Sequence, residues 1–101
     1  MGMSYRPRRT RKDRNQAQIV RELRELGAVV WDLADIGGEV LDILVCWRGQ
    51  CLPVEIKRPG CEDDLTHGEI VALLSLGAVG VEAIVATCTE DILTAFGAAA
   101  S

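Results

Sequence analysis

The stretch that decides the fold runs from Leu41 to Lys57 and reads LDILVCW-RGQ-CLPVEIK. Two apolar runs flank a polar Arg48-Gly49-Gln50 segment, a pattern typical of two strands joined by a tight turn. If Arg48 and Gly49 form a two-residue turn, residues facing one another across the hairpin have numbers that sum to 97. We therefore expect Asp42 directly opposite Glu55 in an antiparallel ladder.

This register predicts a cluster of charges on one face of the sheet. Directly paired residues have Cβ atoms about 4.5 to 5.5 Å apart, and Lys57 points the same way as Glu55 because side chains alternate along a strand. Two like charges side by side are unfavourable unless a cation lies between them. Mg²⁺ binds one or two carboxylates and water, and would activate that water for phosphodiester hydrolysis, with Lys57 orienting it or offsetting negative charge. The alternative is that these residues form a solvated charged face.

The rest of the chain supplies helices and two further strands. Asp13 is expected to cap a helix that ends at Gly27, and Thr66 one that runs to about Leu76 before Gly77. The remaining predicted elements are a strand over Ala28–Asp35, a strand over Val79–Ala86, and a helix capped by Thr89 that reaches Phe96. The order αβββαβα predicts an α/β fold with a four-stranded mixed sheet flanked by helices.

Charge is distributed unevenly along the 101 residues, which suit one domain. Residues 1–14 hold six basic residues and one acidic residue, whereas residues 15–101 hold five basic and fourteen acidic ones. We expect a flexible basic arm over 1–12, a body over 13–97 and a frayed end over 98–101. The arm either neutralises DNA phosphates or is only a solvated terminus. The DNA-contact candidates are Arg8, Arg9, Arg11, Lys12, Arg14 and, beside the charged cluster, Arg58.

The chain has no apolar run long enough for a membrane span and no apolar stretch after its basic start, so a cytoplasmic location is expected. Four cysteines in such a chain are more often free thiols or metal ligands than disulfides. A zinc module built from Cys46, Cys51, Cys61 and His67 is one alternative. We favour buried thiols, because the usual two-to-four-residue spacing between cysteine ligands is missing.

The Asp followed by Glu-x-Lys on the next strand, after an N-terminal helix, resembles the PD-(D/E)XK nuclease superfamily. Within it, the chain is most similar to the VRR-NUC and Holliday-junction-resolvase-like group of phages and bacteria. The resemblance covers most of the body and implies a restriction-endonuclease-like αβββαβ core. The matching segments are Asn15-Gln16, Gly27–Val30, Gly37–Val45, Val54–Lys57 and Leu65-Thr66.

The resemblance implies that Asp42 and Glu55 bind Mg²⁺ or Mn²⁺, that the Ile56 carbonyl is a further ligand and that Lys57 is catalytic. The implied activity is a metal-dependent deoxyribonuclease acting on branched DNA in a bacterial or phage-infected cell, without an organic cofactor or a membrane partner. A body of about 85 residues covers little duplex, so we expect a homodimer joined through Trp47 or the edge of the strand predicted over Val79–Ala86.

The chain departs from the family pattern at three places. Asn15 or Gln16 stands where many members have a helix Glu, Leu41 replaces a Pro, and Glu69 replaces a Gln. We therefore treat Asn15, Gln16 and Glu69 as auxiliary candidates. A non-catalytic DNA-binding or assembly subunit that retains the nuclease fold is the alternative function.

Overall fold

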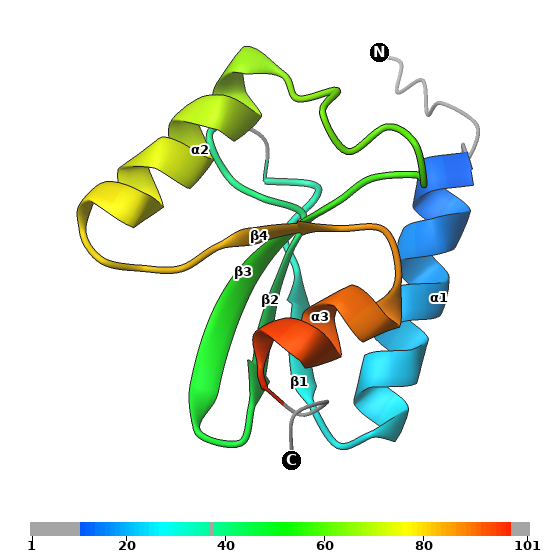
Figure 1. Cartoon of the computed structure of the whole chain (residues 1–101). Helices are drawn as coiled ribbons and strands as arrows, with labels where there is room; N and C mark the ends of the chain where they lie inside the picture. Colours follow the sequence, from blue (N-terminus) through cyan, green and yellow to red (C-terminus); the bar gives the residue numbers. More distant parts are fainter. Residues whose placement is uncertain (1–10, 37, 98–101) are drawn as a thin grey trace, which may run out of the picture.

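The four strands form one mixed sheet. The computed structural model describes residues 11–36 and 38–97, with side chains from Asn15 onward. The elements are α1 (Arg11–Glu25), β1 (Val29–Asp32), β2 (Ile43–Trp47), β3 (Gln50–Ile56), α2 (His67–Ala78), β4 (Ile84–Ala86) and α3 (Thr89–Ala95). The strand order is β1-β2-β3-β4, with β3 and β4 parallel and the other pairs antiparallel. The predicted α/β class and mixed sheet are confirmed (Figure 1).

The β2–β3 hairpin has the predicted register. Its ladder runs from Ile43 opposite Val54 to Trp47 opposite Gln50, so every pair sums to 97. Arg48 and Gly49 both have positive φ angles, of 53° and 79°. Positive φ at both central residues defines a type I′ turn, whose twist matches that of the flanking strands.

The apolar core lies between one face of the sheet and helices α1 and α3. Side chains on alternate positions of β2 and β3 point into it, and α1 and α3 cover them. The buried core residues include Ile19 and Leu23 of α1, Ile43 and Val45 of β2, Val54 and Ile56 of β3, and Ile92 of α3. Figure 1 shows α2 well separated from α1 and α3, and α2 packs near the opposite face, beside Leu44 and Pro53. The two faces of the sheet therefore have different neighbours.

Several predicted boundaries are wrong, and local hydrogen bonds explain two of them. The N–H of Ala34 donates to Oδ1 of Asp32, a turn that ends β1 early (3.1 Å). Helix α2 passes through Gly77 and ends in a Schellman motif at Gly80, which has a φ of 85°. There the N–H of Val81 donates to the carbonyl of Leu76 (2.9 Å), which leaves β4 only three residues.

Of the three predicted N-caps, one is confirmed and two are wrong. Thr66 caps α2 as predicted. Arg11 and Lys12 are already helical, so Asp13 lies inside α1, and the N-cap of α3 is Cys88 instead of Thr89. The Thr89 hydroxyl donates to Glu22 of α1 and so joins the two core helices.

Candidate functional site

The predicted site forms where β3 ends, on the sheet face opposite the core. Glu55 and Lys57 alternate with the buried core residues Val54 and Ile56, so they point away from α1 and α3. Both are nevertheless buried, with 1% and 8% of their surfaces exposed. The alternative of a solvated charged face is therefore wrong for this pair. Charged groups are almost never buried in this way unless they are paired or hold a cation.

The Asp42 side chain also lies at the end of β3, but Asp42 is not paired in the ladder between β2 and β3. The ladder ends at Ile43 and Val54, one pair before the predicted pairing of Asp42 with Glu55. The Asp42 carboxylate turns to the backbone of β3, where its Oδ2 accepts a hydrogen bond from the N–H of Ile56 (2.8 Å). Because the N–H and C=O of one strand residue point to the same side, the Ile56 carbonyl also lies on the side of Asp42. The Asp42 carboxylate therefore contacts the backbone of β3 at the residue after Glu55, and the metal-ligand role of this set stays a prediction.

Lys57 is held at both its backbone and its ammonium group. Its N–H donates to the carbonyl of Ala86 in β4 (2.9 Å). Its Nζ lies 2.9 Å from Oε1 of Glu69 and 3.6 Å from Oε2 of Glu55. The lysine thus bridges two carboxylates from different elements, β3 and α2.

Glu69 enters the site from the first turn of α2. It is the third residue of a capping box: its N–H donates to Oγ1 of Thr66 (3.2 Å), and its Oε1 accepts from the N–H of Thr66 (2.9 Å). Partial burial raises the pKa of Glu69, but hydrogen bonds from Lys57 and Thr66, a hydrogen bond shared with the Glu55 side chain and the charge of Lys57 outweigh it. The pKa of Glu69 falls to about 2.

The contact between Glu69 and Lys57 was not predicted. Thr66-His-Gly-Glu69 has the T-x-x-E pattern of a capping box, so the sequence did offer a signal that Glu69 points back toward the start of α2. Nothing in the sequence indicated that the start of α2 lies close to the end of β3.

The side-chain amides of Asn15 and Gln16 in α1 serve structural roles. Nδ2 of Asn15 donates to the backbone carbonyls of Lys57 (3.1 Å) and Thr87 (3.2 Å), and so joins α1 to the ends of β3 and β4. Gln16 is buried, and its Nε2 donates to Oδ1 of Asp32 (3.2 Å). Asn15 therefore supports the backbone beside the site.

A divalent cation suits the donor chemistry at Asp42 and Glu55. Two carboxylates and one backbone carbonyl are hard oxygen donors, and Mg²⁺ commonly binds through one or two carboxylates and completes its shell with water. Within residues 11–36 and 38–97, no group of three or more His, Cys, Asp or Glu side chains is arranged to hold a metal ion. A cation at this position would therefore be held by two carboxylates and one backbone carbonyl only.

The expectation of free thiols is wrong for two of the four cysteines. Cys46 and Cys51 are joined in a disulfide, whereas Cys61 and Cys88 are free. The register places Cys46 directly opposite Cys51, where bridging needs no rearrangement of the strands. Two members of the proposed zinc set are therefore bonded to each other.

The DNA-contact candidates are only partly described. Arg8 and Arg9, like the rest of the predicted arm up to residue 10, lie outside the described residues, as do the side chains of Arg11, Lys12 and Arg14. Arg58 is exposed and directly follows Lys57. Its contact with DNA stays a prediction.

The two tryptophans differ in exposure. Trp47 is half-buried: it packs edge-on against Phe96, with ring centroids 5.8 Å apart, and the Arg48 guanidinium lies 4.3 Å from its ring centre. Trp31 is 61% exposed. Trp31, and not Trp47, is therefore the tryptophan available to a partner.

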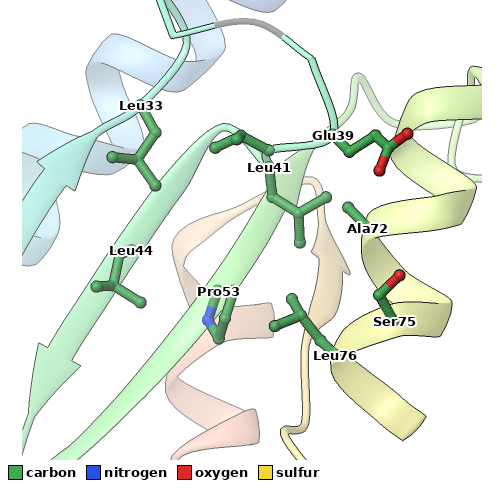
Figure 2. A pocket seen from close by; sticks show the side chains of 9 residues that line it. Leu33, Glu39, Leu41, Leu44, Pro53, Ala72, Ser75 and Leu76 are labelled. Atoms are coloured by element: carbon green, nitrogen blue, oxygen red, sulfur yellow. The ribbon is translucent and has the colours of Figure 1, made fainter. Parts of the chain in front are cut away.

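An apolar pocket of about 310 Å³ lies next to the site, between the sheet and α2. Figure 2 shows Leu44 and Pro53 on the sheet side and Ala72, Ser75 and Leu76 on the helix side. Its lining does not include Asp42, Glu55 or Lys57. The charged cluster therefore lies beside this pocket and not in it.

Comparison with models of protein families, with curated proteins and with solved structures finds no match. Among the helices that the structure describes, none is long and apolar enough to cross a membrane.

Proposed function

We propose that this chain is a Mg²⁺- or Mn²⁺-dependent deoxyribonuclease of the PD-(D/E)XK type, close to the VRR-NUC and Holliday-junction-resolvase-like group. The observation that carries the proposal is the meeting of Asp42 with the end of β3, where Glu55 and Lys57 are buried and the Asp42 carboxylate accepts from the N–H of Ile56. Burying charged groups costs stability unless they are paired or coordinate a metal, and perturbed charged clusters of this kind are frequent at functional sites.

In the proposed reaction, the Asp42 and Glu55 carboxylates and the Ile56 carbonyl would hold the cation. A bound divalent cation would supply Lewis acidity and a lowered pKa for an attacking water. Lys57 donates hydrogen bonds from its ammonium group to that water or to the oxygens of the scissile phosphate, where negative charge develops. The low exposure of Glu55 and Lys57 strengthens these electrostatic interactions because little bulk water screens them.

DNA binding in this proposal falls to basic residues around the cluster. Arg58 can grip a phosphate with its planar guanidinium, and the basic residues of positions 6–14 neutralise further phosphates. We propose branched DNA as the substrate, in the cytoplasm of a bacterial or phage-infected cell. The family resemblance supports both points.

A homodimer would place two such sites across two strands of a DNA junction. Apolar side chains exposed on the sheet face away from α1 support a self-association surface there, with Val29 57% and Trp31 61% exposed. Light scattering during gel filtration tests this proposal. A mass near 22 kDa, twice the 11.0 kDa of one chain, is expected for wild type and 11.0 kDa for Trp31→Asp.

A non-catalytic DNA-binding or assembly subunit is the second candidate. The lack of a helix carboxylate favours it, because Asn15 and Gln16 stand where many members of the family have a Glu, and both amides donate to other protein atoms. Such a subunit would bind branched DNA without cutting it and would show no response to Mg²⁺ or Mn²⁺.

The deciding experiment is cleavage of end-labelled branched and linear DNA with Mg²⁺ or Mn²⁺. We expect wild type and the control variant Glu90→Gln, altered on the exposed first turn of α3, to cut. Glu55→Gln and Lys57→Ala should each lose about 100-fold or more in rate. If wild type leaves every substrate intact, or both site variants cut like wild type, the proposed enzyme function is wrong.

A further inference from the structure

The ammonium of Lys57 is fixed by a residue of a different element. It lies closer to Glu69 of α2 than to Glu55 of β3, at 2.9 Å against 3.6 Å. All three side chains are shielded, with exposures of 10% for Lys57, 17% for Glu69 and 1% for Glu55. Because a lysine side chain has four flexible methylenes, its backbone alone cannot fix where Nζ sits.

Glu69 is itself held in place at both ends. Its backbone N–H donates to the Thr66 hydroxyl, and the same carboxylate oxygen that contacts Lys57 accepts from the N–H of Thr66. The link from the start of α2 to the ammonium of Lys57 therefore contains no freely rotating group.

We propose that Glu69 is a positioning residue of the site: it fixes Nζ of Lys57 beside Glu55 and thereby couples helix α2 to the reacting centre. The catalytic part of this inference rests on the proposed nuclease function. Glu69 acts through Lys57 and does not itself touch the DNA or the cation.

One substitution separates this role from helix capping. Glu69→Gln removes the negative charge but preserves the capping box, since Gln serves at that position as well as Glu. Thr66→Ala removes the cap while leaving the Glu69 carboxylate. Glu90→Gln removes the same charge from the first turn of α3 and serves as the matched control.

The first test needs no nuclease activity, because the chain has only two lysines, Lys12 and Lys57. Limited reductive methylation of the folded protein, quantified by peptide mass spectrometry, gives the labelling rate of Lys57 relative to Lys12. We expect this ratio to rise several-fold in Glu69→Gln and to match wild type in Glu90→Gln. An unchanged ratio in Glu69→Gln would overturn the inference.

The second test compares steady-state cleavage of branched DNA. We expect Glu69→Gln to lower kcat about 10-fold with KM unchanged. A displaced ammonium would stabilise the transition state less but would leave the affinity for DNA the same. Adding Glu69→Gln to Lys57→Ala should cause no further loss. Equal kcat in Glu69→Gln and wild type would refute the positioning role. A wild type that cuts no DNA would instead refute the nuclease proposal, and the labelling ratio would still decide whether Glu69 fixes Lys57.

Discussion

The carboxylate of Asp42 accepts a hydrogen bond from the backbone N–H of Ile56, at 2.8 Å. This bond takes the place of a ladder pair between β2 and β3. The Asp42 carboxylate is thereby fixed at the backbone of β3, at the residue that follows Glu55, by the protein itself. Preorganised charge of this kind is a common source of catalytic power.

Asp42→Asn should weaken metal binding while largely preserving the fold. An asparagine oxygen can still accept from Ile56, but it lacks the charge that attracts a divalent cation. We expect Mn²⁺ affinity, measured by titration calorimetry, to fall about 10-fold or more, with a change in the free energy of unfolding of about 1 kcal/mol. Undiminished Mn²⁺ affinity would remove Asp42 from the ligand set.

Asn15→Ala should destabilise the protein by about 1 to 3 kcal/mol, because the carbonyls of Lys57 and Thr87 lose their shared donor. Urea unfolding measures the change. The sequence resemblance instead places Asn15 where many members of the family have a helix Glu, so the two roles predict different results. A variant with unchanged stability but weakened Mn²⁺ binding would contradict the structural role assigned here.

Two glycines three residues apart should respond in opposite directions to alanine. Gly77 lies inside α2 with open space around it, so Gly77→Ala should stabilise by about 1 kcal/mol. Gly80 has a φ of 85°, so Gly80→Ala should destabilise by about 1 kcal/mol. Each variant is the control for the other in thermal unfolding. Equal shifts of the same sign would show that α2 ends elsewhere.

The Cys46–Cys51 disulfide should protect two of the four thiols from alkylation. Denatured but unreduced protein is expected to take up two iodoacetamide groups, at Cys61 and Cys88, and four after reduction. The chain-entropy model assigns so short a loop about 2 kcal/mol of stability, which Cys46→Ser with Cys51→Ser would remove. Uptake of four groups without reductant would contradict the bond.

Acid should weaken the folded state through Glu69. Its pKa falls from 4.5 to about 2 on folding, so the folded state favours the ionised form. That contribution is complete above about pH 4.5 and is lost as the pH falls toward 2. In metal-free buffer, the loss of stability of Glu69→Gln over this interval should be shallower than that of wild type. Parallel acid curves for both proteins would contradict this prediction.

The hairpin could be predicted because its determinants are local. Arg48 and Gly49 set the turn, and the turn sets the register that places Cys46 opposite Cys51 and Glu55 near Asp42. Family resemblance then supplied roles for the charges. The departure of Asp42 from the ladder could not be predicted, because a side-chain acceptor replaced a backbone pair that the register alone would allow.

The unpredicted features depend on contacts between distant segments or on competing local bonds. Glu69 meets Lys57 only because α2 folds back over the end of β3. No pattern in the sequence indicates that these two segments lie close together. The disulfide was not predicted, because the hairpin register places the two cysteines close together but does not show whether their thiols are oxidised. The short β4 was not predicted because Gly77 and Gly80 both suit a helix end, and the prediction placed the end of α2 at Gly77. The helix instead ends in the motif at Gly80, which leaves fewer residues for β4.

Helix α2 is attached to the rest of the protein by polar contacts more than by apolar burial. Of its twelve residues only Ala72 is buried, whereas Leu74 is 69% exposed. Elements with little buried apolar surface open first under native conditions. In hydrogen-exchange terms, α2 should open with a smaller free energy than the core strands. Each opening would carry Glu69 away and free the ammonium of Lys57, so access to the buried charges would be set by the local stability of one helix.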